Sequence, residues 1–496
     1  MFKLTDPQRS LFEVGSLMPE TKREACRRSW AGPFREKVLP MLLAHENDFA
    51  ELYDSTQGRP NKSTALVVGT LVLQELNDLT DAEAMGALDF DLRWVFAFDV
   101  ELGEAHVCPK TLHNFRVGLM EHDKSRLVFR RLTDDLIVAL GIDTSKQRLD
   151  STHILSNIAL LSRLGVFCET IRVFLHALKK ADAKIYASLP AGLLRRHGEE
   201  ADYGDARKAD RQRRLAVVAR DTYRLVERFK DTKMVQALEA YRLLERVLKE
   251  RCEIVTAPES PKDDDDDQGE GPVPVKLKEA KQVKSDSLQT PHDPDVTYSG
   301  HKGQGYEVQI AETCQDKDTP KDKRNPVQLM TEVKVTPSAR SDARQTIPMI
   351  EALEAAGHKP DTALADTTYS GAENAAKAAQ HHVDLWAPCP AKGKPDPQKT
   401  YPLPALHCPE TKEEAAEWLK QQEASPDFKK NYALRSGIEG TNSEWKRGQG
   451  AGRLRVRGGQ RVELVVYFKA AACNLKRALN YWQTPPATGE PACILV

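Results

Sequence analysis

The sequence predicts a mixed α/β protein, in which a strand-rich core is interrupted by a large helical block and preceded by an all-helical N-terminal domain. Three observations predict this fold class. Apolar residues recur at helical spacing over residues 1–140 and again over 157–255, whereas from Tyr298 onward they alternate with polar residues as in strands. In addition, a chain of 496 residues is too long for one core, so about two to four domains are expected.

The N-terminal domain, residues 1–140, is predicted to consist of short packed helices. Thr80 begins a T-x-x-E capping box with Glu83, a pattern that marks the start of a helix. Residues 141–156 are predicted to contain the first core strand, over Gln147–Asp150, which must be short because a helical pattern resumes soon after it.

The helical block and the segment after it differ sharply in composition. Within residues 157–255, apolar residues form a stripe at helical spacing that includes Tyr241, Leu244 and Val247. Residues 256–296 are poor in apolar residues and rich in Asp, Pro, Gly and Lys, which predicts an acidic flexible linker.

The remaining core is predicted over residues 297–482, followed by a C-terminal tail at 483–496. Alternating apolar residues predict two strands, and a helical pattern follows them. Two further strands are expected, the first with Asp366 at its end. The predicted strands and helix are Tyr306–Ile310, Leu329–Val335, Ser341–Ala355, His358–Asp366 and Val383–Ala387.

Four polar residues near the C-terminus are spaced to share one helix face. Tyr432, Arg435, Glu439 and Lys446 have offsets of 0, 3, 7 and 14, and seven residues make nearly two helical turns. Such a stripe suits binding of a metal-bound phosphodiester and packs an apolar core poorly. Glu444 is a rival acid, but it lies about 140° around the helix from Glu439.

This Tyr-x2-Arg-x3-Glu-x6-Lys spacing resembles a motif of bacterial insertion-sequence transposases of the Asp-Asp-Glu class. RLDSTHI and TALADTTYSG resemble the blocks that carry the family's two catalytic aspartates, here Asp150 and Asp366, and Glu439 matches the third acid. The resemblance implies a ribonuclease-H-like core into which residues 157–255 are inserted. It also implies an InsH-type N-terminal domain that binds DNA, for which a dimerisation or scaffold bundle is the alternative.

The resemblance also implies a chemistry. Asp150, Asp366 and Glu439 are expected to be catalytic and to hold two Mg²⁺ (or Mn²⁺) ions, because carboxylates are the hard ligands that these ions prefer. The expected activity is cleavage at terminal inverted repeats and strand transfer into target DNA. Alternatives are an inactive DNA-binding regulator and a nuclease without strand transfer.

Basic residues define the expected DNA surface. Net charge is −1, but the segment from Lys446 to Arg477 carries nine basic residues and one acid. The residues expected to contact DNA phosphates are Tyr432, Arg435, Lys446, Arg453, Arg455 and Arg457; for the last three a solvated face is the alternative. The acidic run Asp263–Asp267 is read as part of a solvated linker, with mimicry of DNA as the alternative.

The expected partners are double-stranded DNA, at element ends and at the target, and a second copy of the chain in a homodimer on DNA. No apolar run approaches the length of a membrane span. The nine cysteines are widely separated, as is typical of reduced thiols in a cytoplasm. A cytoplasmic, nucleoid-associated protein is therefore expected.

Overall fold

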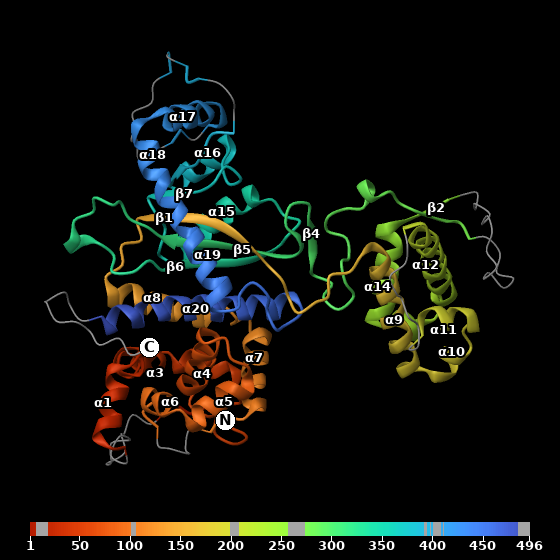
Figure 1. The fold of residues 1–496 in the computed structure, drawn as a ribbon, viewed down its shortest axis with the longest axis horizontal. Coiled ribbons are helices and arrows are strands. Elements are labelled where there is room, and N and C mark those ends of the chain that lie inside the picture. The colour runs from red at the N-terminus through yellow and green to blue at the C-terminus, as the bar shows by residue number, and fades with distance from the viewer. Residues whose placement is uncertain are drawn as a thin grey trace.

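The computed structural model describes most of the chain and shows a central sheet between layers of helices (Figure 1). The described residues are 1–5, 18–100, 106–198, 208–255, 273–390, 394–396, 398–399, 408–409 and 411–484. The acidic run Asp263–Asp267 and residues 485–496 of the predicted tail lie outside them.

The sheet is mixed, with the strand order β6-β5-β1-β7-β8. Strand β5 is antiparallel to both β1 and β6, whereas β7 is parallel to β1 and to β8. A short strand, β4, also pairs with the start of β5. This topology is consistent with a ribonuclease-H-like core. The strands are β1 (Lys146–Ile154), β4 (Thr297–Ser299), β5 (Gly303–Thr313), β6 (Met330–Pro337), β7 (Thr362–Leu364) and β8 (Asp384–Trp386).

The first core strand is longer than the sequence predicted. Asp150 lies in the middle of the nine-residue β1 and not at the end of a short strand. The reason is that β5 pairs with β1 along nearly its whole length, from Gln147 opposite Thr313 to Ile154 opposite Tyr306. Ladder hydrogen bonds from a long neighbour therefore extend a strand whose own sequence signal is short.

Helices cover both faces of the sheet. On one face, α15 (Thr346–Ala355) packs over Leu149 and Ala363, and α16 (Ala372–Gln380) lies between it and α17 (Lys412–Ala424). On the other face lies α20 (Gly459–Gln483), the last helix of the described chain.

Helix α20 joins the N-terminal helices to the sheet. Its middle, Val466–Leu475, is buried on every side, because α4 (Thr64–Leu76) and α8 (Leu127–Leu140) pack on one side of it and β6 on the other. One apolar cluster therefore runs from the N-terminal helices through α20 to Val308 and Ile310 of the sheet. The other N-terminal helices are α1 (Glu20–Arg28), α2 (Ala31–Pro33), α3 (Leu39–Ala44), α5 (Asp81–Phe90), α6 (Leu92–Ala97) and α7 (Pro109–Glu121), and the predicted capping box of Thr80 and Glu83 is confirmed.

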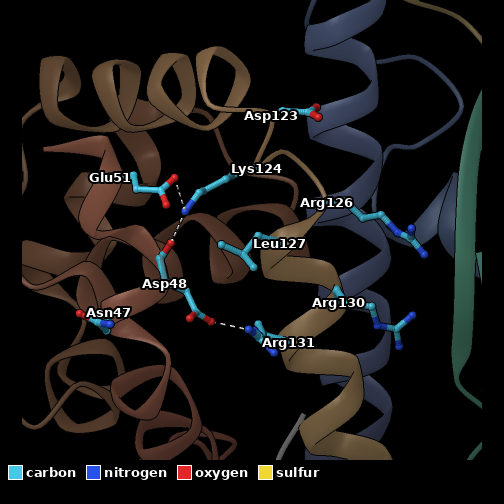
Figure 2. A pocket seen from close by; sticks show the side chains of 9 residues that line it. All are labelled: Asn47, Asp48, Glu51, Asp123, Lys124, Arg126, Leu127, Arg130 and Arg131. Carbon is cyan, nitrogen blue, oxygen red and sulfur yellow. Dashed lines mark hydrogen bonds and ion pairs between the residues drawn. The ribbon is translucent and has the colours of Figure 1, made fainter. Parts of the chain in front are cut away.

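A surface cavity of about 520 Å³ lies at the junction of the N-terminal helices and the core, and Figure 2 shows the side chains that line it. Lys124 pairs with Glu51 at 3.0 Å and Arg131 with Asp48 at 2.7 Å. On the other side of the start of α8, Arg126 forms an ion pair with the buried Glu332 of β6, and Arg130 donates to the Thr331 carbonyl. The cavity is therefore lined by cations that already have partners and hold the N-terminal helices to one another and to the sheet, and it is not a free anion site. These cations are Lys124, Arg126, Arg130 and Arg131.

The inserted helices form a body with its own core, beside the sheet in Figure 1. The predicted stripe is confirmed, since Tyr241, Leu244 and Val247 are buried in that core. Its buried Asp221 accepts hydrogen bonds from Arg196 and lies 2.7 Å from the ring of His197. The elements are α9 (Arg163–Ala181), α10 (Ala183–Ala187), α11 (Ala191–His197), α12 (Lys208–Phe229), α13 (Lys233–Gln236), α14 (Glu239–Arg251), β2 (Cys252–Ile254) and β3 (Val275–Leu277).

The prediction of a flexible linker is wrong for its second part, residues 273–296. Leu288 is fully buried against the core of the insertion. Asp293 is also fully buried, and its carboxylate accepts hydrogen bonds of 2.6 Å from the hydroxyls of Ser156 and Tyr306. Few apolar residues suffice here because the anchoring contacts are buried polar ones.

Candidate active site

Two of the predicted acids are brought together by the pairing of β1 with β7. In this parallel pair, Arg148 stands opposite Leu364, the last residue of β7, and Asp150 and Asp366 each follow two residues later in the chain. The charge of Asp366 is close enough to raise the pKa of Asp150. Distant chain segments thus contribute two neighbouring carboxyl groups.

Asp150 has a strongly perturbed carboxyl group. Burial raises its pKa to about 6, and Asp366 adds to that shift, whereas the Arg435 guanidinium opposes it. Asp366 lies just beyond the end of β7, and its carboxylate accepts a 2.8 Å hydrogen bond from the backbone N–H of Thr368. Arg435, the backbone N–H of Ser151 and Lys302 therefore offset only part of the effect of burial on the pKa of Asp150.

The four-residue stripe lies on three successive helical segments and not on one α-helix. Tyr432 is on α18 (Pro426–Ala433), Arg435 on a 3₁₀ turn (Leu434–Ser436), and Glu439 and Lys446 on α19 (Gly437–Gly448). The tighter turn has about three residues per turn, which shifts the phase of the side chains. Tyr432 stacks on Phe428 with ring centroids 5.3 Å apart.

Arg435 connects the stripe to the first aspartate. Its Nη1 lies 3.7 Å from Oδ1 of Asp150 and its Nη2 lies 3.3 Å from Oε1 of Glu439. The same guanidinium lies over the Tyr432 ring at 5.8 Å. Glu439 is thus separated from Asp150 by one guanidinium, and its side chain is 67% exposed.

Two lysines border the acids. Burial lowers the pKa of Lys446, and the neighbouring Lys302 lowers it further, while Asp150 opposes this shift. Lys302 lies in the turn between β4 and β5, where it forms an ion pair with Glu307 and donates to Ser151 Oγ at 3.3 Å. Sequence reasoning missed Lys302; the available signal was a lysine in the turn before the strand that pairs with β1.

The rival acid Glu444 faces away from the aspartates. Its carboxylate pairs with Arg477 at 3.1 Å and Lys476 at 3.2 Å, both on α20. Glu444 therefore anchors α19 to α20, whereas Glu439 is on the side of Asp150.

A buried ionic network beneath α19 also escaped sequence reasoning. Glu312 of β5 is fully buried, and its carboxylate binds Arg148 and Arg477, each at 2.6 Å. The hydroxyl of Thr441 on α19 donates to the same carboxylate at 2.6 Å. Nothing in the local sequence distinguishes these residues from surface charges, yet they fix α19 against the sheet.

Arg453, Arg455 and Arg457, the three arginines of the sequence RLRVR, lie in an extended segment beside Leu155. Arg453 donates to the carbonyl of Ile158 at 2.9 Å, and Arg457 donates to that of Asn157. Arg455 instead pairs with Asp78 of the N-terminal helices at 2.8 Å, with 52% of its side chain exposed.

The donor set fits a hard divalent cation. Asp150 and Asp366 contribute two carboxylates that interact electrostatically, and the raised pKa of Asp150 reflects burial and like charge that a cation would relieve. In the described part of the chain, no three His, Cys, Asp or Glu side chains stand close enough to hold an ion in the present rotamers. Glu439 completes the set only if its exposed side chain turns from Arg435 toward the aspartates.

Two family matches cover separate parts of the chain. Residues 355–479 match the family described as transposase DDE domain, and residues 34–117 match a transposase domain (DUF772). Together they support an insertion-sequence transposase, and the first implies an enzyme that cuts DNA and transfers strands. Comparison with curated proteins and with solved structures gave no match.

The first match includes Asp366, Glu439 and all of α19, while Asp150 lies before it. The second match spans α4, α5 and most of α7. Among the helices of the described residues, none is long and apolar enough to span a membrane.

Proposed function

We propose that the chain is a transposase that binds the terminal inverted repeats of its element, cuts there and joins the freed strand to target DNA, with Mg²⁺ or Mn²⁺ at Asp150, Asp366 and Glu439. One observation carries the proposal: Asp366 follows the end of β7, next to β1, close enough for its charge to raise the pKa of Asp150, and Glu439 lies one guanidinium away. The match to a transposase DDE domain supports it.

Each side chain has a role in the proposed reaction. Two bound divalent ions would make the attacking water or 3′-hydroxyl more acidic and stabilise the leaving oxygen. Asp150 and Asp366 supply oxygen ligands from a rigid sheet, and Glu439 supplies its own from α19. Arg435, held over Tyr432, and Lys446 neutralise phosphate charge beside the scissile bond.

The DNA surface is proposed to continue from α19 into the RLRVR segment. Arg453, Arg455 and Arg457 are exposed and lie directly after α19. Phosphate contacts by these arginines would be independent of sequence and sensitive to salt. The N-terminal helices are proposed to bind the repeats, and a homodimer on DNA would bring two ends together.

The test is cleavage of a labelled element end by the purified chain with Mg²⁺, compared with its Asp366→Asn variant. The variant should lose nicking while retaining DNA binding. Asp361→Asn, just before the other end of β7, is the matched control and should cut normally. Unchanged cleavage by Asp366→Asn would reject the site.

A pre-cut end with a free 3′-hydroxyl separates strand transfer from simple hydrolysis. Joined products are expected for a transposase. Cleavage without joining would identify a nuclease, and metal-independent binding without any scission would identify a DNA-binding regulator.

A further inference from the structure

Asn442 lies on α19 three residues after Glu439, and its half-buried side chain reaches β1. Its Nδ2 donates a 3.0 Å hydrogen bond to Oδ2 of Asp150, a residue 292 positions away in the chain. Residues three apart on a helix lie on neighbouring positions of one side. Glu439 and Asn442 therefore lie on neighbouring positions of α19, and in this structure Asn442 is the one that contacts Asp150.

The amide of Asn442 has no other hydrogen bond that explains its orientation. Its Oδ1 is buried and accepts no hydrogen bond from any part of the chain that the structure describes. Exchanging the amide oxygen and nitrogen would place a carbonyl oxygen against the Asp150 carboxylate, which is repulsive, so the contact with Asp150 fixes the assignment. A buried polar atom without a partner is rare, and here the hydrogen bond to Asp150 is what holds the Asn442 amide in this orientation.

The two oxygens of Asp150 are held by different groups. Oδ1 faces the Arg435 guanidinium at 3.7 Å, and Oδ2 accepts the hydrogen bond from Asn442. Arg435 brings a positive charge that competes with a bound cation. An amide orients the carboxylate without cancelling its charge.

We propose that Asn442 is a positioning residue of the metal site, which fixes the rotamer of the Asp150 carboxylate by a neutral hydrogen bond and leaves its charge available to a divalent cation. This inference rests on the proposed metal site. Hydrogen bonds from such outer residues typically change metal affinity by about 10- to 100-fold.

Substitution of Asn442 can distinguish a positioning role at the metal site from a purely structural role. Asn→Leu preserves the approximate shape of the side chain and removes the donor. Asp150 is the only hydrogen-bonding partner of the Asn442 amide among the described residues, so the variant also removes a contact between α19 and β1. The melting temperature of each metal-free variant is therefore measured first, and Mn²⁺ affinity is compared at a temperature at which all variants are folded. Ser443→Ala, at the next position of α19, is the matched control.

The experiment titrates Mn²⁺ into the full metal-free chain and measures free Mn²⁺ by electron paramagnetic resonance. We expect Asn442→Leu and Asn442→Ala to weaken Mn²⁺ binding by about 10- to 100-fold relative to wild type, and Ser443→Ala to bind as wild type does. Wild-type affinity in both Asn442 variants would overturn the positioning role while leaving the metal site intact. Absence of Mn²⁺ binding in the wild type, or binding that survives in Asp366→Asn, would overturn the metal site itself.

Discussion

Gly437→Ala offers a sharp test of how α19 is held in place. A Cβ at Gly437 would lie 2.0 Å from Nη1 of Arg148 and 2.8 Å from its Cζ. The backbone of Gly437 is helical, with φ −61° and ψ −24°, so alanine is excluded by this contact and not by backbone strain. Gly440, on the same helix, has nothing within 4 Å of its Cβ position.

The expected loss in the free energy of unfolding follows from the contacts that Arg148 would lose. Its Nη1 donates to the Leu434 carbonyl at 2.8 Å, and its Nη2 contacts the buried Glu312 at 2.6 Å. Loss of one hydrogen bond to a charged group costs about 1.5–3 kcal/mol, and rupture of a buried ion pair costs about 3–5 kcal/mol. Replacing glycine in a helix returns about 1 kcal/mol, so a net loss of about 1–4 kcal/mol is expected.

The assay is chemical denaturation of Gly437→Ala and Gly440→Ala beside the wild type, followed by DNA cleavage. Gly440→Ala should raise the free energy of unfolding by about 1 kcal/mol, whereas Gly437→Ala should lower it and slow cleavage because α19 carries Glu439. Equal stabilisation by both alanines would refute the packing of Arg148 against α19.

Three other predictions follow from the described contacts. Asp150→Asn should be more stable than the wild type above pH 6 in metal-free buffer, because burial raises the pKa of Asp150 in the folded chain from 3.8 to about 6. The folded wild type therefore binds more protons than the unfolded chain between these two pKa values, and it loses stability as pH rises from about 4 to about 6; parallel pH–stability curves for the two proteins would contradict this. Arg455→Ala should make the binding constant for DNA less sensitive to salt, reducing the magnitude of the slope of log K against log salt by about 1 as measured by fluorescence anisotropy. An unchanged slope would show that Arg455 does not contact a phosphate. Asp221→Asn weakens the buried pairs with Arg196 and His197, so it should destabilise the insertion alone and lower the midpoint temperature of one of two unfolding transitions in calorimetry. A shift of a single common transition would show instead that the insertion and the core unfold together.

Several features were readable from the sequence because they are encoded locally. Period-two alternation located β5 and β6, helical periodicity located α14, and the Thr80–Glu83 pair located the start of α5. The spacing of Tyr432, Arg435 and Glu439 likewise placed them near one another, although a 3₁₀ turn interrupts the helix that the sequence predicted.

Only the tertiary structure decided which remote residues meet. Asn442 and Asp150, or Arg455 and Asp78, have no common sequence pattern, since their contacts form only when strands pair and α20 packs between the N-terminal helices and the sheet. The burial of Glu312 between two arginines has the same origin. Local spacing determines which side chains share a helix or strand face. Tertiary packing determines what that face contacts, and these contacts set both the charges around Asp150 and its pKa.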